Sequence, residues 1–214
     1  MKNKIEKAAG ISLLIGSFLM FVTMVLHPVG GDFEHILRVR VLNMTVHSIA
    51  LVSIPFTWIG FRGVTNRLSA MPFLSQTAYA FITFALVAVM LAATMNGLVL
   101  ANFTYRYAEA SSGLIDAIKP ILHFNSALNH AYDYIFIVGI CVAVLLWSLA
   151  IIKTGALSKW LGWLGIVLSL AALGMGVAGF VFVNLHGFQI FVFGVVAWTV
   201  LAGIGLMRPT PDSA

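Results

Sequence analysis

The chain has 214 residues, of which 61% are hydrophobic and 9% charged, and its formal net charge is +5. An ordinary soluble domain carries roughly 25% charged residues, so this composition excludes a soluble globular domain. The basic excess is dispersed, with no tract longer than the spaced Lys2, Lys4 and Lys7, which argues against a nucleic-acid partner. The single cysteine, Cys141, excludes an intramolecular disulfide and a multi-cysteine zinc or iron–sulfur framework.

Six apolar stretches reach the length of about 20 residues that a helix needs to cross the hydrocarbon core. They cover residues 8–28, 41–61, 73–100, 130–152, 160–183 and 186–207. The runs are continuous rather than alternating, which excludes the strands of an outer-membrane barrel. The first stretch is too long for a signal peptide and no small-residue cleavage site follows it, so we expect it to be retained. The predicted fold is all-α, an integral membrane bundle of six transmembrane helices in a single domain, 1–214.

The positions of Lys and Arg in the short loops predict an orientation with the amino terminus inside. This placement leaves eight basic residues on the cytoplasmic side, namely Lys2, Lys4, Lys7, Arg62, Arg67, Lys153, Lys159 and Arg208. Both termini are then cytoplasmic, and the predicted location is the cytoplasmic (inner) membrane.

The outer side carries the longer connections, 29–40 and 101–129. Asp32 follows two glycines and precedes an apolar run, which predicts a helix N-cap ahead of the second span. Pro120 suits a first helical turn, so we expect the fourth helix to start near residue 121. Pro55 lies inside the second span and predicts a kink there.

Small residues dominate the last third of the chain, where ten of the nineteen glycines lie between Gly155 and Gly205. Ala172 and Gly176 fit the small-x-x-x-small pattern that allows two helices to approach closely. We expect these residues to pack within the bundle, and a homodimer face or a larger membrane complex is the alternative. Membrane lipid is the other expected partner.

All six histidines fall on the outer side in the predicted topology: His27, His35, His47, His123, His130 and His186. Ionisable residues inside a membrane are costly, so such residues are candidates for function. On the second helix, Arg40, Asn43 and His47 are spaced by three and four residues and share a face. On the fourth helix, His130 and Asp133 have the offset by which one helix presents two ligands to a common centre.

We therefore predict an outward-facing site in which His47, His130, His27 and His186 are metal ligands. Three or four such ligands suit zinc, copper or non-haem iron, whereas two opposed histidines suit a b-type haem. Arg40 is the candidate cofactor-binding residue, as an anion or propionate partner. Asp133 is the candidate catalytic residue, as a base beside a metal-activated water, or instead the acceptor that orients a histidine. Such a site would serve redox or hydrolytic chemistry on a membrane-soluble substrate.

Other interpretations remain open. Interfacial histidines also hydrogen-bond headgroups or loop carbonyls. The outer asparagines could either line a pocket or cap helix ends, and capping is the expected role for most of them: Asn96, Asn102, Asn125, Asn129 and Asn184. The inner halves of the spans offer only hydroxyls, such as Ser17 and Ser53, together with Pro55, which argues against a proton-relay pump. A carrier of a hydrophobic solute and a non-catalytic accessory subunit are the rival classes, so enzyme activity is left open.

Two segments of the sequence resemble segments of other membrane proteins. The sequence Leu26-His27-Pro28 at the end of the first span, and the passage 153–165 with its Trp/Gly-rich helix start, look like segments of uncharacterised bacterial six-helix multi-pass membrane proteins. The resemblance implies a bacterial inner-membrane location. It transfers no catalytic residue to this chain.

Overall fold

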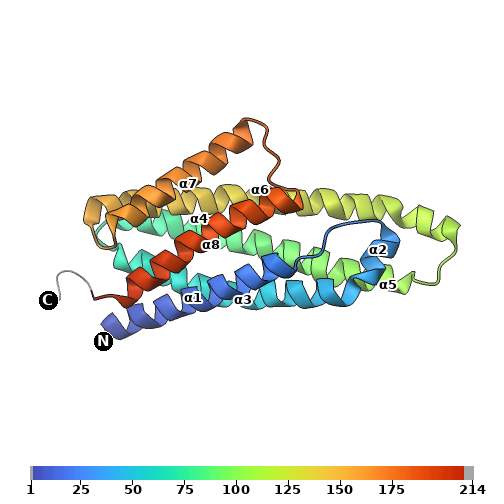
Figure 1. Ribbon diagram of the computed structural model, residues 1–214, viewed down its shortest axis with the longest axis horizontal. Helices are drawn as coiled ribbons and strands as arrows, with labels where there is room; N and C mark the ends of the chain where they lie inside the picture. The colour runs from blue at the N-terminus through green and yellow to red at the C-terminus, as the bar shows by residue number, and fades with distance from the viewer. Residues whose placement is uncertain (1, 210–214) are drawn as a thin grey trace.

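The computed structural model describes residues 2–209, which form a bundle of helices (Figure 1). The elements are α1 (Lys2–Leu26), α2 (Phe33–Arg38), α3 (Arg40–Arg67), α4 (Pro72–Ala92), the π-helical segment η1 (Ala93–Val99), α5 (Leu100–Arg106), α6 (Ser112–Thr154), α7 (Lys159–Val177) and α8 (Leu185–Met207). Residues 1 and 210–214 of the predicted domain lie outside the described residues.

The predicted six spans are confirmed in number. Within residues 2–209, six helical stretches are long and apolar enough to cross a membrane: α1, α3, the continuous α4–η1–α5, α6, α7 and α8. A bilayer requires the backbone N–H and C=O groups of each span to be hydrogen-bonded within the span, and helices meet this requirement. Six apolar helices therefore define a multi-pass membrane protein.

The helices run along the long axis of the molecule (Figure 1). The first turn of α1 and the end of α8 lie at one end, which we call the proximal end, and α2 with the α5–α6 turn lies at the other, the distal end. α1 packs against α3 and α8, and α4 packs against α6. α7 packs on α6, and its C-terminal end leans away from α8. The membrane face to which each end belongs stays a prediction.

The fourth span begins earlier than predicted. α6 starts at Ser112, and Pro120 lies inside the helix rather than in its first turn. Most of the predicted 101–129 loop is therefore helical, and the break between helices falls at residues 107–111. Proline frees the carbonyl four residues earlier, here that of Asp116, and both residues are exposed where water can satisfy that carbonyl. At 1.5 Å per residue α6 is roughly 65 Å long, about twice the hydrocarbon thickness.

The turns that lead into the helices follow local sequence signals. The side chain of Asp32 accepts a hydrogen bond from the His35 backbone amide, which confirms the predicted N-cap, although the capped helix is the short α2. Pro55 lies inside α3 as predicted. α7 ends at Val177, six residues before the predicted boundary, and Gly179 follows with φ 90°, a conformation that side-chain-bearing residues rarely adopt.

The glycines of α7 allow close helix packing, as predicted, in the first half of the helix but not in the second. A side chain at Gly165 would collide with Ser148 and with the indole of Trp198, so this glycine allows α7 to approach α6 and α8 closely. Gly176, in contrast, faces open space in the described residues, so the predicted contact of Ala172-x-x-x-Gly176 is not made within the chain. The homodimer alternative stays a prediction.

The proximal half contains a buried ion pair between two residues that no local sequence pattern relates. Glu6 and Arg67 are 3% and 5% exposed, and Arg67 Nη2 lies 2.6 Å from a Glu6 carboxylate oxygen. Arg67 also donates hydrogen bonds to the backbone carbonyls of Leu206 and Arg208. The pair therefore joins α1, α3 and the end of α8. It lies just outside the predicted spans 8–28 and 41–61, whose inner halves carry buried hydroxyls such as Ser17 and Ser53.

Candidate functional site

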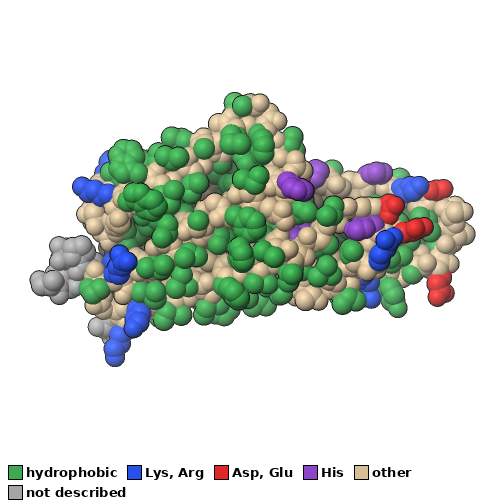
Figure 2. Space-filling view, in the orientation of Figure 1, with side chains coloured by type: hydrophobic (Ala, Val, Ile, Leu, Met, Phe, Trp, Pro, Cys, Tyr) green, Lys and Arg blue, Asp and Glu red, His purple; other side chains and the backbone are tan. Residues whose placement is uncertain are grey.

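A cavity of about 650 Å³ lies in the distal half of the bundle. We call it the distal cavity. Its wall comes from α1, α3, α4, η1, α6 and the start of α8, and the 28–33 turn covers one side. Histidines visible in the space-filling view gather in this half of the molecule, whereas the acidic side chains lie beyond them at the distal tip (Figure 2). The volume is within the roughly 300–1,000 Å³ range of small-molecule sites.

The faces of α1, α3 and α6 that line the cavity change from apolar to polar toward the distal end. On α1 and the residue after it, Met20, Met24 and His27 are spaced by four and three residues. On α3 the order is reversed because the helix runs the other way, with Asn43 and His47 preceding Ile54. Residues three or four apart share a helix face, so these spacings place a polar rim above an apolar floor.

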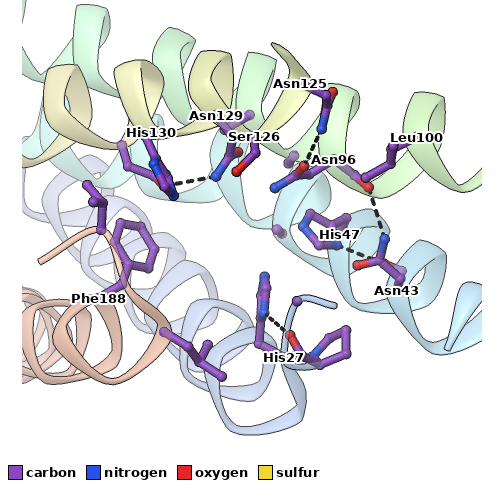
Figure 3. Close-up of a pocket in the computed structure, with 18 of the residues that line it drawn as sticks. His27, Asn43, His47, Asn96, Leu100, Asn125, Ser126, Asn129, His130 and Phe188 are labelled. Carbon is purple, nitrogen blue, oxygen red and sulfur yellow. Dashed lines mark hydrogen bonds between the residues drawn. The ribbon is translucent and has the colours of Figure 1, made fainter. Parts of the chain in front are cut away.

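His27 and His47 meet in the cavity with ring centroids 5.0 Å apart in an edge-to-face arrangement. Nδ1 of His27 lies 2.9 Å from the Pro28 carbonyl oxygen, and Nδ1 of His47 lies 2.8 Å from that of Asn43. A carbonyl oxygen only accepts, so Nδ1 donates in both rings, and Nε2 of each neutral ring is free to accept or to ligate. Both Nε2 atoms point toward the cavity interior (Figure 3).

Burial lowers the pKa of His27 below its ordinary value of 6.5, and its hydrogen bond to Pro28 offsets this only in part. His27 is the residue directly after α1. The imidazole is therefore neutral near pH 7, which leaves its Nε2 lone pair available.

The π-helical segment η1 brings amide groups to the rim. Asn43 Nδ2 donates to the backbone carbonyl of Asn96 at 2.9 Å, and Asn125 Nδ2 donates to the Asn96 side-chain oxygen at 2.8 Å. A side chain at Gly97 would collide with His47, so this glycine lets η1 lie directly on the imidazole. A π-helical turn within an α-helix is frequently found at functional sites, because it re-aims side chains and frees backbone groups.

Asp133 lines the cavity from α6 and is 8% exposed. The hydrogen bond described for its carboxylate comes from Asn129 Nδ2 at 2.9 Å. His130 also lines the cavity but is exposed. Both residues line the same cavity, and among the described residues no ion pair joins them. Their convergence on a common metal stays a prediction.

Two other predicted site residues lie outside the cavity. His186 is exposed at the start of α8, whereas the neighbouring Phe188 lines the wall. Arg40 donates to Asn102 Oδ1 at 3.1 Å and stacks on Tyr105, with its guanidinium carbon 4.0 Å from the ring centroid. Within the described residues no three His, Cys, Asp or Glu side chains come close enough together to hold a metal ion.

Most of the outer asparagines line the cavity, which is the less favoured of the two roles predicted for them. Asn184 does cap a helix, since its side chain accepts from the Gly187 amide. Asn96, Asn125 and Asn129 instead line the cavity. The signal was available, because Asn125, Asn129 and Asp133 are each four residues apart and therefore lie on one face of α6.

Comparison with protein-family models, with curated proteins and with solved structures found no match to this chain. The class that the structure establishes is that of a multi-pass membrane protein built on six apolar helices. The resemblance to uncharacterised bacterial membrane proteins stays an expectation.

Proposed function

We propose that this protein binds a membrane-soluble amphipathic small molecule in the distal cavity, as a carrier or as an accessory protein. One observation supports this proposal above the others: a single cavity of about 650 Å³ has an apolar floor and a rim of convergent hydrogen-bonding groups. Ligand sites generally combine a largely apolar wall with a few polar groups that fix orientation.

The two parts of the cavity correspond to two parts of a ligand. The free Nε2 atoms of His27 and His47 are acceptors at the rim, and the amides that line it offer both donors and acceptors. An apolar chain or ring would lie below them against residues such as Met24, Leu86 and Val192. The apolar part of a membrane-soluble ligand is already out of water in the lipid, so packing against the floor supplies contact, and the polar rim determines orientation and selectivity.

Filling the cavity tests the proposal. Ala50 lines the cavity on α3, whereas Val52 on the same helix is 55% exposed on the outer surface. We expect lipid-like molecules co-purified from the membrane to be detected by native mass spectrometry of wild-type protein in nanodiscs. Ala50→Phe should abolish this bound mass, and the matched Val52→Phe should retain it. Equal retention by both variants would show that the molecule is bound elsewhere.

Metal-dependent chemistry is the second candidate, and the His27–His47 pair favours it. Histidine ligands of metals commonly donate their second ring N–H to a backbone carbonyl, as both rings do here. We expect metal analysis of purified protein to find a transition metal, or a Soret band to report haem, and His47→Ala to remove it. His186→Ala is the control, because His186 lies outside the cavity. Equal loss in both variants, or none in His47→Ala, would exclude the pair as the metal site.

A further inference from the structure

Asp133 is a carboxylate in an apolar helix for which the structure supplies no cation. Asp133 is only 8% exposed, and its described partner is the neutral amide of Asn129. The ion pairs among residues 2–209 are Glu6–Arg67 at the proximal end and Asp116–Lys119 on the exposed distal part of α6. A buried carboxyl group keeps its negative charge only when a cation lies beside it, because an unpaired charge in an apolar site is costly. The place beside Asp133 therefore suits a cation that the ligand itself brings.

The other charged and titratable groups around the cavity do not fill that role. Lys119 lines the opening, but its ammonium lies 2.7 Å from Asp116. His27 and His47 each use Nδ1 for a backbone carbonyl and turn Nε2 toward the cavity. His123 and His130 lie on the same helix as Asp133 and are exposed. The second acidic residue of the wall, Asp32, caps α2.

Aromatic rings lie one turn away from the carboxylate. Phe136, three residues after Asp133, is 2% exposed and lines the cavity together with Phe188. The two ring centroids are 5.9 Å apart. Aromatic faces attract organic cations, and this attraction is strongest in a site from which water is excluded.

We propose that the ligand of the distal cavity is a lipophilic cation, of the quaternary ammonium or phosphonium class, whose charge lies against the carboxylate of Asp133. Its apolar substituents contact Phe136, Phe188 and the floor. This inference rests on the proposed function, because it names the class of the molecule that the cavity binds.

Equilibrium dialysis with radiolabelled tetraphenylphosphonium tests the inference on full-length protein in phosphatidylcholine nanodiscs. We expect saturable binding that Asp133→Asn weakens at least tenfold and that Asp133→Glu partly restores. Asp116→Asn, which removes the exposed carboxylate of the same helix, should bind like wild type. Triphenylphosphine oxide, a neutral molecule of similar aromatic character, should compete at least tenfold less well than unlabelled tetraphenylphosphonium.

Two results would overturn the inference: wild-type affinity in Asp133→Asn, or equal competition by the neutral oxide. The oxide comparison uses wild-type protein and therefore does not depend on the variant folding. If the oxide competes as well as unlabelled tetraphenylphosphonium and Ala50→Phe abolishes the binding of both molecules, the cation inference fails while the proposed function stands. If neither molecule binds and no co-purified mass depends on Ala50, both fail.

Discussion

His27 and His47 each commit one ring nitrogen to a backbone carbonyl, and this fixes both the tautomer and the direction of the free nitrogen. His27 is also harder to protonate in the folded protein than in the unfolded chain, because burial lowers its pKa. Its ionisation is therefore linked to stability.

Acidification should destabilise the protein through His27. The unfolded chain binds a proton near pH 6.5, whereas the folded protein binds it only at lower pH, so stability falls as the pH decreases through about 6.5 and levels off below the folded-state pKa. We expect the midpoint of thermal unfolding to fall more between about pH 7.5 and about pH 5.5 for wild type than for His27→Gln. Identical changes in the two proteins would contradict this assignment.

Gly97 should be intolerant of a side chain. A methyl group there would overlap the Cβ atom of His47, so we expect Gly97→Ala to cost about 1–3 kcal/mol of stability and to displace the imidazole. Gly174→Ala is the control, since that glycine faces open space and alanine favours the helix by about 1 kcal/mol. Thermal unfolding of the two variants measures the difference. A stable Gly97→Ala protein would mean that η1 and α3 are farther apart than the structure has them.

Polar and aromatic contacts join the helices in both halves of the bundle. At the distal end, η1 lies on α3 and its amide network reaches α6. Toward the proximal end, Trp147 stacks between Phe61 of α3 and Trp198 of α8, with ring centroids 4.9 and 6.3 Å away. The Glu6–Arg67 pair adds a polar contact where α1, α3 and α8 end.

Removing one member of that pair should be more harmful than removing both. Arg67→Met leaves the Glu6 carboxylate buried without a cation, and we expect it to cost about 3–5 kcal/mol. The double variant Glu6→Gln/Arg67→Met should recover part of this loss, as judged by chemical or thermal unfolding. Lys119→Met, which breaks the exposed Asp116–Lys119 pair, should leave the melting temperature unchanged. A double variant less stable than Arg67→Met would argue that each side chain acts independently.

The molecule as a whole has both described chain ends at the proximal end and its polar cavity in the distal half (Figure 1). This arrangement follows from an even number of spans. The basic residues of the short loops predict that the proximal end is cytoplasmic, which would open the distal cavity toward the outer face.

Cysteine labelling tests this orientation. Leu114 at the start of α6 is 46% exposed at the distal end, and Ser69 is exposed in the proximal turn between α3 and α4. We expect a membrane-impermeant maleimide to label Leu114→Cys on intact cells and Ser69→Cys only after lysis. Wild type is the blank, because its single Cys141 is buried. The reverse pattern would invert the topology.

Several features were predictable because their causes are local. The apolar runs predict the six spans, and Asp32 predicts the cap of α2 from its own side chain. Pro120 misled the prediction because proline is acceptable inside an exposed part of a helix as well as in its first turn. His186 was predicted as a metal ligand because it lies at about the same depth as the other histidines. Two residues along a helix, however, correspond to a rotation of more than half a turn, so Phe188 faces the cavity and His186 does not.

The amino-acid sequence by itself determined that the protein is a six-span membrane bundle, because hydropathy acts on each segment separately and a bilayer requires every segment to satisfy its own backbone. The tertiary structure decided which polar groups share a cavity. Contacts with neighbouring helices set the rotation of each helix about its axis, and that rotation turns His27, His47 and Asp133 inward while it leaves Arg40 against Tyr105.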